Sequence, residues 1–498
     1  MKSPRQVVFI MTDGQRTDMV GCYGYPAMKT PSLDRLAAGG VRFDRAYTCQ
    51  PVCGPARSAL FTGVWPHGNG SWGNSMALGA NVRTLGQRLQ SADVPAAYIG
   101  KWHLDASDYF GLARCPDGWD PAYWYDMRCY LEELPPEDRV RSRKEKTMHE
   151  PGIAADFTFG HRCTNRAVDY LTKHAADDFC LVVSYDEPHD PYLCPEPFAS
   201  MYRGHEFPKS PNVRDRLAGK PAHQQAWAGA RVQSDRDALK LQPADMLGCN
   251  SYIDSEIGRV IDAIDQCAPG ALVIYTSDHG VMLDSHCLNG KGPVAYDEIT
   301  RVPMIVRWPG HSPAGTAGPQ AVSHIDLTPT ILDYFGQPTP KTLDGRSMLS
   351  TFTSPQTKAN DAVFIEFARY EIDHDGFGGF QPMRAAFDGR YKLAINLLTT
   401  DELYDLQADP QEITNLIDSV EHAVARNALH DKLLDWMNQT RDPFRGYYWE
   451  RRPWRTDARP ASWNYTSMTR QREGEADGEP RQLDYSTGLE MKEATRKK

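Results

Sequence analysis

The sequence lacks any long apolar run. No stretch approaches the ~20 apolar residues that a membrane-spanning helix needs. The only early apolar run, Val7 to Met11, is five residues long and leads directly into Asp13, so it is too short for the core of a secretory signal. We therefore expect no membrane segment and a cytoplasmic protein.

The chain also lacks an excess of basic residues and any C-x-x-C pair. Its net charge of −10 argues against nucleic acid as the main partner, although a local basic pocket could still hold a small anion. The 11 cysteines form an odd set with scattered spacings. This pattern is typical of reduced thiols and not of a disulfide framework.

Apolar residues are sufficient for a large core, at 41% of 498 residues. Continuous apolar runs are typical of strands buried on both faces in a largely parallel sheet, and four such runs occur: Val7 to Met11, Ala96 to Ile99, Phe179 to Tyr185 and Ala271 to Tyr275. Helical spacing occurs between them, at Val82, Leu85 and Leu89 and at Ile253, Ile257, Val260, Ile261 and Ile264. The alternation predicts an α/β sandwich.

Each of these four runs is followed by polar residues of catalytic or metal-binding type. In an open α/β sheet, ligands bind outside the carboxyl ends of the strands, so we expect these residues to meet in one crevice. They are Asp13 after the first run, Lys101 and His103 after the second, Asp186 and His189 after the third, and Asp278 and His279 after the fourth.

Composition divides the chain into three predicted parts. Residues 1–355 form an α/β catalytic domain, and residues 350–361 have the composition of a linker. Residues 356–445 form a smaller α+β unit, with strands from Val363 and a helix through Leu429 and Trp436. The tail 446–498 either wraps a neighbouring subunit or is a flexible end. Residues 190–245 are either a wall of the substrate pocket or a solvated insertion.

The stretch from Cys53 to Gly63 has the residue order of a short helix. Pro55 suits the first turn, and Gly63 can end a helix in the left-handed conformation. Cys53 then lies at a helix N-terminus, where unpaired N–H groups stabilise negative charge. Arg57, one turn later, adds a cation suited to a tetrahedral oxyanion.

This stretch resembles the signature of the sulfatase family, C-x-P-x-R-x-x-L-x-T-G, at every fixed position. The cysteine phosphatases space Cys and Arg by five residues, and the spacing of three here excludes that motif. Further matches to the sulfatase family extend to about residue 440: Met11 to Asp13 with Gly21 to Gly24, Gly100 to Leu104, Pro188 to Tyr192, Ser277 to Gly280 with Lys291, Arg301 to Pro303, Asp326 to Thr330 and Glu402 to Leu406.

The resemblance implies the fold of the alkaline phosphatase superfamily. That fold is a large mixed, mostly parallel central sheet flanked by helices, with a small C-terminal antiparallel sheet and a helix. It also implies that Cys53 is oxidised to formylglycine by a formylglycine-generating enzyme.

One divalent metal ion is implied by the same resemblance. Its ligands would be Asp13, Asp278, His279 and the modified Cys53, with Ca²⁺ first and Mn²⁺ second. Family members carry Asp or Gln where this chain has Gly14. Three alternatives follow: water fills that ligand position, Gln15 swings in, or the metal binds weakly.

The remaining roles also come from the resemblance. Arg57, Lys101 and Lys291 would neutralise the sulfate oxygens, and His189 would protonate the leaving alcohol. His103 would take the proton that lets sulfate leave. Asn74 matches a substrate-binding asparagine of the family, whereas His67 is interpreted as structural.

We therefore expect a sulfatase that hydrolyses a small-molecule sulfate ester to an alcohol and inorganic sulfate, and that forms a homo-oligomer. The first alternative is a phosphonate monoester or phosphodiester hydrolase of the same superfamily, which generally lacks the Lys-x-His pair found here as Lys101 and His103. The second is a noncatalytic binder of sulfated ligands in which Cys53 stays unoxidised.

Overall fold

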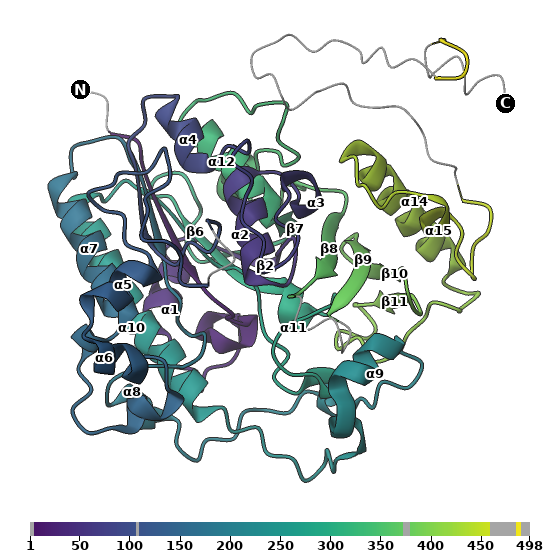
Figure 1. Cartoon of the computed structure of the whole chain (residues 1–498), viewed down its shortest axis with the longest axis horizontal. Helices are drawn as coiled ribbons and strands as arrows, with labels where there is room; N and C mark the ends of the chain where they lie inside the picture. The colour runs from purple at the N-terminus through teal and green to yellow at the C-terminus, as the bar shows by residue number, and fades with distance from the viewer. Residues whose placement is uncertain (1–3, 106–108, 372–378, 459–484, 490–498) are drawn as a thin grey trace.

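A computed structural model describes residues 4–105, 109–371, 379–458 and 485–489 of the chain. In this structure a central sheet with helices on both sides is followed by a smaller sheet near the C-terminus (Figure 1). The predicted tail 446–498 begins with α15 (Tyr447–Glu450), and its residues 459–484 and 490–498 lie outside the described residues.

The central sheet has seven strands in the order β3-β4-β1-β5-β6-β2-β7. Neighbouring strands are parallel except where β6 pairs with β5 and with β2. The strands are β1 (Gln6–Thr12), β2 (Val41–Tyr47), β3 (Ala96–Gly100), β4 (Phe179–Ser184), β5 (Leu272–Ser277), β6 (Arg301–Arg307) and β7 (Thr316–Ser323). The four predicted runs are β3, β4, β1 and β5, which lie side by side.

Both faces of the sheet are buried, which explains why these strands read as continuous apolar runs. Phe9 points to one side and Ile10 to the other, because side chains alternate along a strand. The helices that cover the Phe9 face are α2 (Cys53–Thr62), α4 (Leu85–Gln90), α12 (Leu327–Tyr334) and α13 (Leu349–Thr353). The helices on the Ile10 face are α1 (Pro31–Ala38), α5 (Met127–Glu133), α7 (Phe159–Lys173) and α10 (Ala244–Cys267).

A four-stranded antiparallel sheet follows in the order β11-β10-β9-β8. Its strands are β8 (Val363–Arg369), β9 (Phe380–Phe387), β10 (Tyr391–Asn396) and β11 (Glu402–Asp405). Helix α14 (Ala423–Gln439) packs Leu429 and Leu433 against Leu393 and Ile395 of β10. The two sheets and their helices confirm the predicted alkaline-phosphatase-like fold class (Figure 1).

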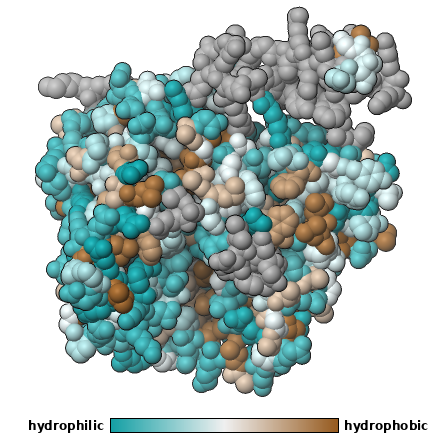
Figure 2. All heavy atoms as spheres, viewed as in Figure 1, coloured by the Kyte–Doolittle hydropathy of each residue, from teal (hydrophilic) through white to brown (hydrophobic). Residues whose placement is uncertain are grey.

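Shorter helices connect these layers. They are α3 (Pro66–Asn69), α6 (Pro136–Arg141), α8 (Phe198–Met201), α9 (Ala222–Ala228) and α11 (Asp297–Thr300). On the face shown in Figure 2, hydrophilic residues predominate and apolar residues appear in small groups between them. Within the described residues, every helix is too short or too polar to cross a membrane.

Candidate active site

The carboxyl ends of four neighbouring strands carry the predicted polar residues. Asp13 follows β1, Lys101 follows β3, Asp186 lies two residues after β4 and Asp278 follows β5. Because these strands are parallel neighbours, the four side chains meet at one edge of the sheet. The crevice expected from the sequence is therefore present.

Helix α2 brings Cys53 to this edge. The helix begins at Cys53 itself, two residues earlier than Pro55 suggested, and every one of its residues is buried. Its C-terminus agrees with the prediction, since Gly63 has φ +68° and its N–H bonds to the carbonyl of Ala59. The side chain of Asn74 accepts a hydrogen bond of 3.0 Å from the Gly54 N–H, so it satisfies one of the unpaired donors of the first turn.

Asp13, Cys53, Asp278 and His279 offer four possible metal-ligand atoms that lie within 4.8 Å of one another. The Cys53 Sγ is 3.1 Å from His279 Nε2 and 3.5 Å from Asp13 Oδ1. The His279 Nδ1–H donates to the Gly280 carbonyl at 2.7 Å, so Nε2 is the unprotonated nitrogen that could bind a metal. The four residues therefore fit a divalent cation.

The carboxylates of Asp13 and Asp278 are buried and lie within 4.8 Å of each other, so ionising both is unfavourable. Burial and the nearby carboxylate of Asp13 raise the pKa of Asp278. Burial alone would raise the pKa of Asp13 as well, but the ammonium groups of Lys101 and Lys291 bring it well below its usual value. A bound divalent cation would compensate the charge of both carboxylates.

Three cations surround the carboxylates and Cys53. The Arg57 guanidinium donates to Asp278 Oδ2 at 3.0 Å and to Asp13 Oδ2 at 3.2 Å. The Lys101 Nζ is 2.8 Å from Asp13 Oδ2, and the Lys291 Nζ is 2.6 Å from the Cys53 Sγ. This arrangement places fixed positive charge around the reactive position, as a tetrahedral oxyanion requires.

Two histidines stand beside these cations. The His189 Nε2 is 3.3 Å from Lys291 Nζ, and its Nδ1 is 2.8 Å from the carboxylate of Asp190. His103 is buried with φ +60°, and its Nδ1 has no hydrogen-bond partner among the described residues. Burial, together with Lys101 and Arg57, lowers the pKa of His103 well below its usual value, so the ring is neutral.

Two residues near the site had no predicted role. The Asp186 carboxylate accepts from Lys101 Nζ at 2.9 Å and from the Tyr109 hydroxyl, and Lys101 also donates to that hydroxyl at 2.6 Å. The Tyr109 ring lies 5.2 Å from the His103 ring and 5.5 Å from the His189 ring, measured between centroids. The position of Asp186 after a predicted strand placed it in the expected crevice, although without a role. No sequence pattern indicated Tyr109.

Gly14 and Gln15 follow Asp13, the first of the possible metal ligands. The Gln15 side chain donates to Asn250 Oδ1 at 2.6 Å and accepts from the Tyr275 hydroxyl, so it does not turn toward the cluster. Gly14 itself has φ +75°, which favours glycine, and a Cβ atom added there would lie 3.5 Å from Val281 and 3.8 Å from His279. Gln15 is thus engaged away from the cluster, and the choice among the three alternatives stays a prediction.

His67 lies outside the crevice, in a second group of charged residues. Its Nδ1 is 2.5 Å from Glu366 Oε2, and Asp442 completes a group that could hold a metal. Arg384 already compensates these acids, with its Nε 2.5 Å from Asp442 and 4.0 Å from Glu366. This geometry agrees with the structural role expected for His67.

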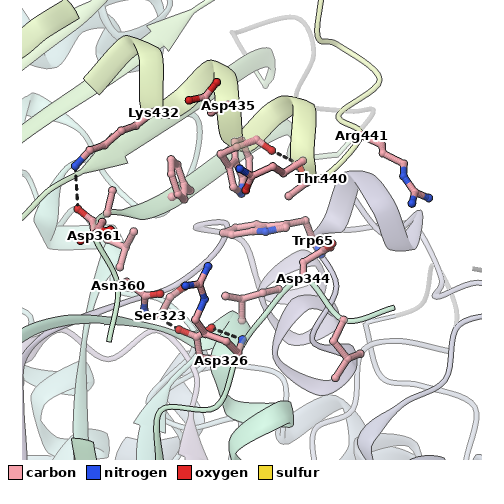
Figure 3. A pocket seen from close by; sticks show the side chains of 18 of the residues that line it. Trp65, Ser323, Asp326, Asp344, Asn360, Asp361, Lys432, Asp435, Thr440 and Arg441 are labelled. Atoms are coloured by element: carbon pink, nitrogen blue, oxygen red, sulfur yellow. Dashed lines mark hydrogen bonds between the residues drawn. The ribbon is translucent and has the colours of Figure 1, made fainter. Parts of the chain in front are cut away.

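A cavity of about 480 Å³ lies elsewhere, between the region of α3 and α12 and the C-terminal sheet (Figure 3). Figure 3 shows Trp65 at its centre and Lys432 of α14 bonded to Asp361 at its edge. Its lining holds equal numbers of basic and acidic side chains, namely Lys341, Arg346, Lys432 and Arg441 against Asp326, Asp344, Asp361 and Asp435. This balance favours no anionic ligand, and the lining includes none of the predicted site residues.

Comparisons with known families match almost the whole chain. The sulfatase family model matches residues 5–337, and the model of the N-sulphoglucosamine sulphohydrolase C-terminal region matches residues 291–439. The chain is 43% identical over 496 residues to the uncharacterized sulfatase YidJ of Escherichia coli, covering 98% of this chain and 97% of that protein. It is 24% identical over 511 residues to an N-acetylglucosamine-6-O-sulfatase of Bacteroides thetaiotaomicron, covering 88% of this chain and 87% of that one.

A solved structure shows the same architecture. The phosphonate monoester hydrolase of Agrobacterium radiobacter superposes with a TM-score of 0.73 at 24% identity, covering 88% of this chain and 96% of that chain. At this identity the likeness establishes the alkaline-phosphatase-like fold only. The family models and the relatives establish more, and the chain belongs to the sulfatase family and is a sulfuric ester hydrolase.

Proposed function

We propose that this enzyme hydrolyses the sulfate ester of a small alcohol with Cys53, oxidised to formylglycine, as its nucleophile and with one divalent metal ion. The observation that carries the proposal is the position of the Cys53 Sγ. It lies at the start of a buried helix, 2.6 Å from Lys291 Nζ and 3.1 Å from His279 Nε2. The aldehyde hydrate would supply a hydroxyl that attacks sulfur, and the metal would favour its ionised form.

The side chains around Cys53 would bind and stabilise the sulfate. Arg57 and Lys101 carry fixed positive charge in the buried part of the site, and the half-buried Lys291 adds a third cation beside Cys53. These cations would stabilise the negative charge that develops on the sulfate oxygens in the transition state. Because they are already in place, the side chains would need little rearrangement, and such electrostatic stabilisation is often the largest contribution to catalysis.

The two histidines would move protons. His189 borders the cavity above the site and is held by Asp190, so it can protonate the oxygen of the leaving alcohol. His103 is neutral because its pKa is low, so it can accept a proton from the second hydroxyl of the hydrate. Asn74 would hold the start of α2 through Gly54.

Asp13, Asp278 and His279 would hold the metal together with the modified residue 53. Two carboxylates suit Ca²⁺, and the single imidazole leaves Mn²⁺ as the second choice. Maturation would require a formylglycine-generating enzyme in the host, because the unmodified thiol has no aldehyde to hydrate.

The first test is the kcat/KM for an aryl sulfate against an aryl phosphonate monoester. Residue 53 of the enzyme is first confirmed as formylglycine by peptide mass. A preference for the sulfate supports the proposal, and a preference for the phosphonate would replace it with the phosphonate monoester hydrolase function. The Lys101 and His103 pair favours the sulfatase reading.

The second alternative from the sequence, a binder without catalysis, conflicts with membership of the sulfatase family. It predicts an unmodified thiol at position 53 in protein purified from its native host. Peptide mass therefore decides between binder and enzyme before any kinetic measurement.

A further inference from the structure

A cavity of about 350 Å³ opens directly beside the catalytic residues. His189, His279, Lys291 and Gly14 are among the residues that line it. Because Lys291 and His189 would contact the sulfate and the leaving oxygen, the alcohol part of the substrate must occupy this space. The residues that line the cavity therefore indicate which kind of alcohol the site can bind.

Trp227 forms the wall next to Lys291. A Cβ atom added to Gly292 would lie 3.0 Å from Trp227 Cη2, so the six-membered end of the indole rests against the backbone of the residue that follows Lys291. The indole is half-buried, and its exposed part lines the cavity. Glycine at position 292 is what allows this close approach.

Helix α9 holds Trp227 in this position. Its His223 lies one turn earlier on the same face and donates from Nε2 to the Pro293 carbonyl at 2.8 Å. The neighbouring Gln224 donates to both oxygens of Glu402 in β11 at 3.0 Å. The helix is thereby anchored to Pro293, which lines the cavity, and to Glu402 in β11, so the indole is a preorganised surface.

The rest of the wall is mostly apolar. Met246, Val281 and Tyr192 come from three other segments of the chain. Polar side chains also line this space, among them Asp190, which is paired with His189, and Asn289, whose Oδ1 accepts from the Gly290 N–H at 3.0 Å. Such a wall suits a ring with an apolar face better than a chain of hydroxyl groups.

A second cavity adjoins the first. It has a volume of about 430 Å³ and shares Tyr192, Met246 and Val281 with the first. Its lining adds the charged residues Lys240, Asp245 and Asp284. Residues 190–245 therefore line both cavities, which would make them a wall of the substrate pocket if the alcohol binds here.

We propose that the substrate alcohol carries a ring with an apolar face, close to the ester oxygen, that stacks on Trp227. This inference rests on the proposed sulfatase function. Both an aromatic ring and a sugar ring have an apolar face that can stack on an indole. The experiment below distinguishes these two kinds of substrate.

The test compares primary alkyl sulfates, because their leaving alcohols have similar reactivity and differ mainly in binding. The set is ethyl sulfate, 2-phenylethyl sulfate and glucose 6-sulfate, measured as kcat/KM with formylglycine-confirmed enzyme. We expect at least one ring-bearing ester to exceed ethyl sulfate by about 10-fold or more. Which of the two does so identifies the source of the ring.

The variants are Trp227→Ala, Trp227→Phe and a control, Tyr447→Ala, which removes an exposed aromatic residue outside the cleft. Trp227→Ala should lower kcat/KM for the ring-bearing ester by about 10-fold more than for ethyl sulfate, and Trp227→Phe should restore part of this ring advantage. Equal losses for all three esters, or no advantage of any ring, would overturn the inference. If 4-nitrophenyl sulfate is not hydrolysed either, the proposed function itself fails.

Discussion

The ammonium nitrogen of Lys291 lies 2.6 Å from the sulfur of Cys53, although the two residues are 238 positions apart in the sequence. Lys291 also approaches His189 and His279 at 3.3 and 3.4 Å. One cation thus contacts the position of the nucleophile, the proposed acid and a proposed metal ligand. Removing it should affect the transition state more than the fold.

Lys291→Ala should lower kcat for sulfate hydrolysis by about 10²–10³-fold, because a preorganised charge aimed at the sulfate oxygens is lost. The measurement is steady-state kinetics with an aryl sulfate. Lys173→Ala, at a lysine paired only on the surface, serves as the matched control. Turnover by Lys291→Ala at the wild-type rate would contradict the proposed role.

Cys53→Ala should abolish sulfate turnover, with a loss on the order of 10⁴-fold or more, because the nucleophile can no longer form. The side chain is small and fully buried, so its removal should cost only about 1 kcal/mol of unfolding free energy. Kinetics and thermal unfolding are measured on the same sample. Residual activity near the wild-type level would assign the nucleophile to another residue.

Much of the fold could be predicted because four central strands are buried on both faces. The strands β2, β6 and β7 of the central sheet were not predicted, and the sequences of β2 and β7 explain why these two were missed. Within β2, Arg42 and Asp44 are partly exposed and interrupt the apolar pattern. Strand β7 forms the edge of the sheet and contains Gly318 and Pro319, which weaken any strand signal.

The residues of the site also differ in how far the sequence predicts their positions. Asp13, Lys101 and Asp278 follow predicted strands, so sheet geometry alone brings them together. Lys291 and Tyr109 lie in loops, whose paths depend on packing that sequence patterns do not encode. Resemblance to the family identified Lys291, whereas Tyr109 became visible only through its contact with Asp186.

Asp186→Asn should lower kcat by about 10-fold while the protein stays folded. The Asp186 carboxylate holds Lys101 Nζ at 2.9 Å from one side, and Asp13 holds it from the other. A neutral amide would weaken this second contact and let the ammonium move away from the sulfate position. Tyr109→Phe, which keeps the carboxylate, should lose less, and an equal or larger loss would contradict this order.

Calcium should stabilise the protein through the buried acidic cluster. A ligand that binds only the folded state adds about 2.7 kcal/mol at 100 times its Kd. The thermal midpoint of the wild type should therefore rise with Ca²⁺ and, as the second choice, with Mn²⁺. Asp278→Asn removes one carboxylate and should lose most of this shift, so an equal shift in both proteins would place the ion elsewhere.

His67 makes the stability depend on pH. Burial of the ring, whose side chain is 2% exposed, opposes protonation, but the Glu366 carboxylate raises the pKa of His67 above its ordinary value of 6.5. The folded protein therefore binds this proton more tightly than the unfolded chain does. The resulting stabilisation is fully present below pH 6.5 and is lost as the pH rises through the folded pKa.

His67→Asn should remove this contribution, so the difference in unfolding free energy between the wild type and the variant should be largest near pH 6 and shrink toward pH 9. Urea denaturation of both proteins at three pH values measures that difference. His311→Asn, at an exposed histidine, controls for the substitution itself. A difference that stays constant or grows with pH would mean that His67 is not held as a cation by Glu366, and the ion group with Arg384 and Asp442 would then stabilise the fold without it.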